Sequence, residues 1–268
     1  MNSLNNNVLI FGGASGIGWA TARILMEHGA RVTIADVRTP AALNDSSLLY
    51  VDCDVRDAEQ VSEAVRQATE AGPLDWLVYS TGIQHYGSVV STPVEEYDLV
   101  QSINARGAFL ACRAAIPVMR SGGAIVLVSS VQALACQEGV AAYAASKGTL
   151  EALTRAMAVD HAKDNIRVNA VLPGTVDTPM VRSSAERFSG ANGLEQTLQQ
   201  WGDHHPLGRI AHANEIANLI AFLLSEKASF ITGASYNADG GLLAQLAVRL
   251  HRKRCGEQAA HTGFEREE

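Results

Sequence analysis

A serine, a tyrosine and a lysine near the middle of the chain have a spacing that suits acid–base chemistry on a hydroxyl group. Tyr143 and Lys147 are four residues apart, so they share one face of a helix, and Ser130 precedes Tyr143 by thirteen residues. The pKa of an isolated tyrosine is about 10, and a neighbouring ammonium group lowers it by favouring the phenolate. The spacing predicts that Tyr143 moves a substrate proton while Ser130 holds the substrate oxygen. An ordinary surface pair is the alternative interpretation.

A glycine-rich turn lies near the start of the chain. Gly12, Gly16 and Gly18 follow the apolar run 8–11 and precede a segment with helical spacing of apolar residues. Glycines let a backbone turn tightly and approach a pyrophosphate, whose charge is stabilised at the N-terminus of a helix. The turn therefore predicts a dinucleotide site, and a simple helix-capping turn is the alternative.

Asp36 lies at the expected end of the second strand, eighteen residues after Gly18. A carboxylate at this place accepts hydrogen bonds from the adenosine ribose hydroxyls and repels a 2′-phosphate. NAD is therefore the expected cofactor, with NADP disfavoured. Arg38 acts against this preference because a guanidinium binds phosphate, and a solvated strand-end aspartate is the alternative for Asp36.

The composition limits the classes of function that the chain can have. It has 268 residues, 47% of them hydrophobic, with a net charge of −7 that argues against nucleic acid as a partner. We find no apolar run of the roughly 18 residues that a membrane span needs, and no signal peptide at the start. The four cysteines are scattered without a CxxC pair. We therefore expect a cytoplasmic protein with reduced thiols, a small-molecule substrate, no membrane contact and no metal site.

Apolar runs of strand length alternate with segments of helical spacing. The expected strands are 8–11, 31–35, 48–51, 74–79, 124–129, 166–172 and 235–238, and the expected helices include 58–70, 94–119, 142–162 and 214–224. This alternation predicts an α/β fold, a Rossmann-like doubly wound parallel sheet of about seven strands with helices on both faces. We see no repeat or linker, so residues 1–241 are expected to form a single domain.

Two segments interrupt the alternation. Residues 176–206 are polar and poorly periodic, and a loop of this length after the sixth strand is expected to be a substrate lid. Residues 242–268 form a tail in which leucines at helical spacing precede a basic cluster. We expect a terminal helix followed by disorder, and a basic binding arm is the alternative.

These residues together resemble the short-chain dehydrogenase/reductase family from Val8 to about Gly241. The resemblance is carried by FGGASGIG at 11–18, DV at 54–55, INARGAF at 103–109, VSS at 128–130, YAASK at 143–147, RVNAVLPGTVDTP at 167–179 and ITGASYNADGG at 231–241. It implies four catalytic residues, namely Asn104, Ser130, Tyr143 and Lys147, with Asn104 holding a water that links Lys147 to solvent. It implies cofactor contacts from Gly12, Ser15, Gly16, Ile17, Gly18, Asp36, Asp54, Val55, Gly82, Tyr143, Lys147, Pro173, Gly174, Val176 and Thr178.

The chain departs from the family pattern in two places. Phe11 stands where the family usually has a threonine, so a hydroxyl that ties the first strand to the fourth is expected to be lost. The usual Asn-Asn-Ala-Gly after the fourth strand is Tyr79-Ser80-Thr81-Gly82, which keeps the glycine but changes the side-chain contacts.

The resemblance implies an oxidoreductase that transfers a hydride reversibly between a secondary alcohol and nicotinamide. Candidate substrate residues are His85, Gln132, Gln137, Arg182 and Trp201, several of which form hydrogen bonds. Such side chains suit a sugar, a polyol or a similar hydroxylated or carboxylated metabolite. A ketone reductase, for example of 3-oxoacyl thioesters, and a non-catalytic dinucleotide sensor are the alternatives. The family pattern also implies a homotetramer with segments 94–119 and 142–162 between subunits.

Overall fold

A computed structural model describes residues 6–40 and 47–246 of the chain. Their main sheet is parallel and has seven strands in the order β3-β2-β1-β4-β5-β6-β9. The strands are β1 (Asn7–Phe11), β2 (Arg31–Asp36), β3 (Leu48–Asp52), β4 (Leu74–Tyr79), β5 (Met119–Val128), β6 (Arg167–Pro173) and β9 (Ser235–Ala238), and a second, two-stranded sheet pairs β7 (Val176–Asp177) with β8 (Ala211–His212). The predicted doubly wound α/β fold is confirmed.

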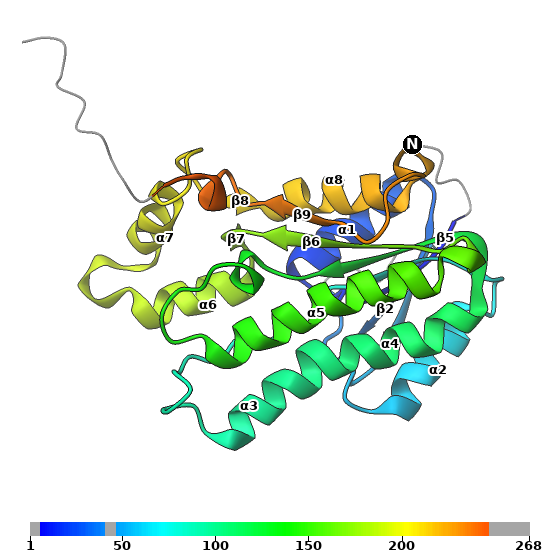
Figure 1. Cartoon of the computed structure of the whole chain (residues 1–268), viewed down its shortest axis with the longest axis horizontal. Coiled ribbons are helices and arrows are strands. Elements are labelled where there is room, and N and C mark those ends of the chain that lie inside the picture. Colours follow the sequence, from blue (N-terminus) through cyan, green and yellow to red (C-terminus); the bar gives the residue numbers. More distant parts are fainter. Residues whose placement is uncertain (1–5, 41–46, 247–268) are drawn as a thin grey trace, which may run out of the picture.

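Helices cover both faces of the main sheet (Figure 1). They are α1 (Gly16–Glu27) and α8 (Ala213–Leu224) on one face, and α2 (Ala58–Ala68), α4 (Gly107–Ala115) and α5 (Ala141–Asp160) on the other, with α3 (Val94–Gln101) beside α5. Successive strand residues point to opposite faces. Val8 and Ile10 therefore pack with α1 and α8, whereas Leu9 and Phe11 pack with α2, α4 and α5. Apolar burial on both faces is why these strands read as continuous apolar runs.

The segment 94–119, expected to be a long helical stretch, is helical from Val94 to Val118 but changes its helix type along the way. A π-helix, η1 (Ser102–Arg106), separates α3 from α4, and a short 3-10 helix, η2 (Ile116–Val118), ends the segment before β5. Pro117 lacks the N–H that would continue a helix. The predicted helical stretch over 94–119 is thus confirmed up to Val118, whereas β5 begins five residues earlier than expected, at Met119 rather than 124.

The segment 176–206, expected to be a loop, is largely helical. It contains α6 (Pro179–Phe188) and α7 (Leu194–Asp203), which lie beyond one end of the sheet (Figure 1). Thr178 caps α6 by accepting a hydrogen bond from the Val181 N–H, and Gly193 precedes α7 with a φ of 76°. The chain thus places two helices at the position where the sequence predicted an irregular lid.

Short 3-10 turns complete the described chain: η3 (Val131–Ala133), η4 (Ala162–Asp164), η5 (Gly190–Asn192), η6 (Glu226–Ala228) and η7 (Leu242–Ala244). The predictions for the tail beyond residue 246, including its basic cluster, lie outside the described residues. Within residues 6–40 and 47–246, no helix is long and apolar enough to cross a bilayer.

Candidate active site

A cavity of about 990 Å³ lies at the carboxyl edge of the sheet. Its walls come from the ends of six strands, beginning with β1 and β4, where the strand order changes direction and ligands of doubly wound sheets bind. The predicted residues that line it are Gly12, Ser15, Gly16, Ile17, Asp36, Asp54, Val55, Gly82, Ser130, Tyr143, Lys147, Pro173, Gly174, Val176 and Thr178. Gly18 and Asn104 do not line the cavity.

The glycine turn between β1 and α1 leaves backbone amides facing the cavity. Ser15 is the N-cap of α1 but makes no side-chain capping bond, so the first N–H groups of this helix lack a capping side chain. Gly12 has a φ of +78°, and a Cβ there would lie 2.5 Å from the Thr81 backbone nitrogen. Gly16 has a φ of +55° and lines the same wall. Free amides at a helix N-terminus and glycine backbone fit a pyrophosphate.

Asp36 joins the end of β2 to the glycine turn. Its two carboxylate oxygens accept hydrogen bonds from the backbone N–H groups of Ala14 and Arg38, each at 3.0 Å. Each oxygen retains a lone pair for a further donor. The side chain is therefore held in place at the cavity wall with acceptor capacity left for ribose hydroxyls.

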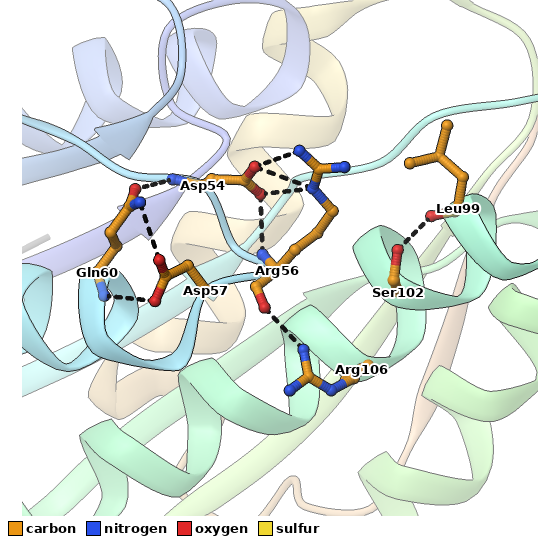
Figure 2. Close-up of polar contacts among 7 residues, drawn as sticks. All are labelled: Asp54, Arg56, Asp57, Gln60, Leu99, Ser102 and Arg106. Atoms are coloured by element: carbon orange, nitrogen blue, oxygen red, sulfur yellow. Dashed lines mark hydrogen bonds and ion pairs between the residues drawn. The ribbon is translucent and has the colours of Figure 1, made fainter.

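Asp54, at the end of β3, is already engaged by an arginine two residues later (Figure 2). Arg56 donates to both carboxylate oxygens at 2.5 to 3.0 Å, and these hydrogen bonds hold the Asp54 pKa below its ordinary value although partial burial opposes them. The Arg106 guanidinium, from η1, donates to the Arg56 carbonyl at 2.7 Å. This loop is thus tied to the π-helix that carries Asn104.

Tyr143 and Lys147 lie together on α5, as their spacing predicted. The Lys147 Nζ sits 5.5 Å from the centre of the Tyr143 ring and donates to the Val128 carbonyl at 2.8 Å. Ser130, at the end of β5, lies on the same cavity wall and accepts a hydrogen bond from the Gln132 N–H at 3.2 Å. The structure therefore brings the three side chains to one place.

The electrostatics of Tyr143 differ from the sequence-based prediction. Burial raises the pKa of Tyr143 to about 12; a hydrogen bond from Ser130 acts to lower it and the charge of Tyr86 acts to raise it. Lys147 is itself buried, which lowers the pKa of its ammonium to about 8. The pKa of Tyr143 is thus raised, chiefly by desolvation, and not lowered by Lys147 as the spacing predicted. The protein's own groups keep Tyr143 protonated at neutral pH.

Lys147 gives a prediction about stability. Its pKa of about 8 in the folded protein lies below the ordinary 10.5, so the unfolded chain binds more protons between these values and stability rises with pH across that window. At pH 7 this burial costs roughly 3 kcal/mol. We expect Lys147→Met to stabilise the protein by about 1–3 kcal/mol at pH 7 and by under about 1 kcal/mol at pH 10.

Urea unfolding at both pH values, at one protein concentration, measures this difference. Lys163→Met is the matched control because Lys163 is exposed in η4, and its substitution should change neither value. Equal destabilisation by Lys147→Met at pH 7 and pH 10 would contradict the buried-charge account.

Asn104 is fully buried in the π-helix behind the cavity wall. Its Oδ1 accepts from the Ile83 N–H at 2.8 Å, and its Nδ2 donates to the Ile83 carbonyl at 2.9 Å and to the Ser146 hydroxyl at 3.0 Å. A Cβ on Gly82 would lie 3.4 Å from the Lys147 Nζ and 3.5 Å from the Asn104 Oδ1. Gly82 therefore lies between these two polar groups.

The two departures from the family pattern form one packed unit. Phe11 and Tyr79 are partners in neighbouring strands, both fully buried, with ring centres 6.2 Å apart. The Tyr79 hydroxyl donates to the Ile103 carbonyl at 2.5 Å, and a Cβ on Gly107 would lie 2.4 Å from that hydroxyl oxygen. Phe11 stands where the family usually has a threonine, and Tyr79 where it usually has an asparagine. In this chain the two residues instead supply aromatic packing and a hydrogen bond to η1.

One of the five candidate substrate residues, His85, lines the cavity, and its Nδ1 lies 3.2 Å from Glu96. The other four, Gln132, Gln137, Arg182 and Trp201, are not on the wall. Arg182 is bound to Asp177 and Glu195 instead.

Two lining residues that the sequence did not single out, Tyr86 and Arg187, lie near the tyrosine end. The sequence points to them only by their positions, because Tyr86 follows β4 and Arg187 lies within the lid segment. In the described part of the chain, no group of three His, Cys, Asp or Glu side chains is arranged to hold a metal ion.

A parallel doubly wound sheet with a glycine turn and a buried tyrosine–lysine pair defines a dinucleotide-binding enzyme. A family model described as enoyl-(acyl carrier protein) reductase matches residues 12–243. The chain belongs to the short-chain dehydrogenase/reductase family and is an oxidoreductase acting on CH–OH groups.

Individual relatives agree with this assignment. The chain is 39% identical over 249 residues to trans-4-hydroxycyclohexanecarboxylate dehydrogenase of Sinomonas cyclohexanicum, covering 87% of this chain and 91% of the relative. It is 34% identical to meso-2,3-butanediol dehydrogenase of Serratia marcescens, covering 90% and 95%. The ligand-free structure of Thermoplasma acidophilum aldohexose dehydrogenase superposes with a TM-score of 0.88 at 34% identity, covering 93% and 98%.

Proposed function

We propose that this protein is an NAD-dependent dehydrogenase that oxidises a secondary alcohol of the sugar, polyol or similar hydroxylated class. The observation that carries the proposal is the meeting of Ser130, Tyr143 and Lys147 on one cavity wall with the glycine turn. The relatives named for hydroxycyclohexanecarboxylate, butanediol and aldohexose support it, because each of these compounds carries a CH–OH group.

The protein's own residues would handle the proton. Tyr143 removes the proton of the substrate hydroxyl, and Ser130 orients that oxygen and stabilises its developing charge. Nicotinamide, when bound, would supply the acceptor for the hydride from the carbon that bears this hydroxyl. Because burial raises the Tyr143 pKa, a positive charge brought into the cavity is needed to favour the phenolate, and Lys147 adds to that charge.

Asn104 and the lid have supporting roles in this proposal. The Asn104 Oδ1 lies close to Gly82 and Lys147 and has a lone pair free for a water that would carry protons from Lys147 to solvent. Thr178, the N-cap of α6, lies beside Gly16, and the α6 residues Met180 and Val181 line the cavity, which suits a lid that excludes water.

The preference for NAD rests on Asp36. Its free lone pairs suit ribose hydroxyls, and its negative charge repels a 2′-phosphate. We expect kcat/KM with NAD to exceed that with NADP by at least about tenfold, the effect of one hydrogen bond to a charged group. Asp36→Ala should narrow this ratio, whereas Arg38→Ala, which removes the neighbouring cation on the same wall, should widen it.

The direct test follows the absorbance of reduced nicotinamide with NAD and NADP in parallel. The panel of alcohols includes 4-hydroxycyclohexanecarboxylate, 2,3-butanediol, aldohexoses and simple secondary alcohols. Turnover of any of them with NAD preferred supports the proposal. Turnover with NADP alone would favour the ketone-reductase alternative, and cofactor binding with no turnover would favour the dinucleotide sensor.

We also propose a cytoplasmic homotetramer with α4 and α5 between subunits. Phe109 on α4 and Val159 on α5 expose 51% and 77% of their area in the single chain, which suits an apolar interface. Cys53 and Cys112 are buried thiols and Cys136 is an exposed one, which suits a reducing compartment. Light scattering after size-exclusion chromatography tests the assembly.

A further inference from the structure

Arg187, in the last turn of α6, is held against two aromatic rings at the edge of the cavity. Its guanidinium carbon lies 5.4 Å from the centre of the Tyr86 ring and 5.7 Å from the centre of the Phe188 ring. The two rings pack edge to face, with centres 4.7 Å apart. Cation–π contacts with two rings favour this position of the guanidinium before any ligand arrives.

The guanidinium of Arg187 has no hydrogen-bond partner within residues 6–40 and 47–246. Among the described residues, none accepts a hydrogen bond from its guanidinium, and no carboxylate lies within ion-pair distance. Its sequence neighbour Glu186 is exposed and forms no ion pair with it. A guanidinium has five N–H donors in a fork that matches a carboxylate, and a cation–π contact uses none of them as a hydrogen-bond donor to an oxygen.

The other basic side chains on the cavity wall have partners or lie elsewhere. Arg56 is bound to Asp54, His85 lies beside Glu96, and the Lys147 Nζ donates to the Val128 carbonyl. Arg38 lies at the end of β2, beside Asp36 and far along the sheet from the tyrosine end. In the described part of the chain, Arg187 is thus the cation at the tyrosine end of the cavity that lacks a partner.

Arg187 shares the cavity with Tyr143 and is linked to it through Tyr86. It stacks on Tyr86, and Tyr86 is near enough to Tyr143 for its charge to affect that phenol. Ser183, Ser184 and Met180 line the wall along the same helix. A molecule between Tyr143 and Arg187 would therefore meet a short stretch of α6 with both polar and apolar side chains.

We propose that Arg187 binds a carboxylate on the substrate, so that the protein acts on a hydroxy acid rather than on a neutral sugar or diol. This inference rests on the proposed function, because it places the hydroxyl at Tyr143 and Ser130. The carboxylate then lies against the guanidinium fork, and its position sets which carbon is presented to the tyrosine.

A cofactor phosphate is the competing ligand for this cation. The α6 N-cap, Thr178, lies beside Gly16 in the glycine turn, where a pyrophosphate would bind. Arg187 follows Thr178 by nine residues, which is about 13 Å along a helix at about 1.5 Å per residue. Its separation from the glycine turn and its stacking on Tyr86 favour the substrate.

The test measures binding without turnover. Calorimetry on the NAD-saturated protein compares cyclohexanecarboxylate with cyclohexanecarboxamide, a neutral compound of the same shape. We expect the acid to bind about ten- to hundredfold more tightly, as for a bidentate ion pair. Arg187→Ala should remove this preference, Arg187→Lys should keep part of it, and the control Arg23→Ala, on an exposed α1 arginine, should leave it unchanged.

Three results would overturn the inference. The intact protein could bind the acid and the amide with equal affinity, or Arg187→Ala could weaken the binding of both compounds by the same factor. The third is weaker binding of NAD by Arg187→Ala. For any hydroxy acid that the enzyme oxidises, Arg187→Ala should raise the KM of the acid and not that of its methyl ester. Failure to oxidise any alcohol would contradict the proposed function and leave the binding result standing, so the two failures are distinguishable.

Discussion

Tyr143→Phe is expected to lower kcat/KM for alcohol oxidation by about a thousandfold, within the range that a general acid–base group contributes. The substitution removes one oxygen and keeps the ring, so the packing of the buried side chain and its contact with the Lys147 ammonium are preserved. The dissociation constant of NAD should change little. The loss should therefore appear in kcat rather than in cofactor binding.

Steady-state kinetics and fluorescence titration of NAD measure the two quantities separately. Tyr97→Phe is the control, because Tyr97 is exposed on α3 and does not line the cavity. In the intact enzyme, oxidation should accelerate as pH rises above 7, since the reactive form is the phenolate and burial raises the Tyr143 pKa. Substantial activity in Tyr143→Phe would remove this residue from the proposed mechanism.

The sequence predicted the cavity wall well because parallel sheets bring strand ends to one edge. Gly12, Asp36 and Ser130 are far apart in the chain, yet each follows an apolar run of strand length, and all three line the cavity. Topology alone, without any side-chain contact, accounts for that success. The same argument cannot find Asn104, which is buried in a π-helix rather than at a strand end.

Predictions that depended on side-chain partners were less successful. Arg182 and Arg187 are five residues apart on α6, which is about 140° around a helix, so they point to different sides. Which one faces the cavity depends on Asp177 and Glu195, and those partners bind Arg182. The prediction of a lowered Tyr143 pKa was wrong for a related reason. Burial raises this pKa, and burial is a property of the whole fold.

The lid helices have a signal in the sequence. Leu194, Leu198 and Trp201 have the spacing of one helix face, and they lie in α7. Thr178 followed by a proline is a typical helix start. The change from α-helix to π-helix at η1 had no such signal. It accompanies the hydrogen bond from the Tyr79 hydroxyl to the Ile103 carbonyl, and these two residues are far apart in sequence.

Gly18→Ala is expected to disable the cofactor site. A Cβ at this position would lie 2.1 Å from the Gly12 carbonyl oxygen and 3.0 Å from the Gly13 Cα. Both are backbone atoms, so the clash is relieved only by moving the glycine turn away from α1. Overpacking of this kind costs about 1–3 kcal/mol or more, and a displaced turn should weaken NAD binding by at least about a hundredfold.

Gly148→Ala provides the matched control, because Gly148 is also a helical glycine and, beyond its own helix backbone, a Cβ there meets no atom of the described residues within 4 Å. Replacing a helical glycine by alanine in open space stabilises a helix by about 0.5–1 kcal/mol. Unfolding measurements should therefore show a lower stability for Gly18→Ala and a higher stability for Gly148→Ala. NAD titration should show weaker binding in Gly18→Ala only. If Gly18→Ala behaved like Gly148→Ala, the glycine turn would not need close backbone contact, and the pyrophosphate site proposed there would lose its main structural support.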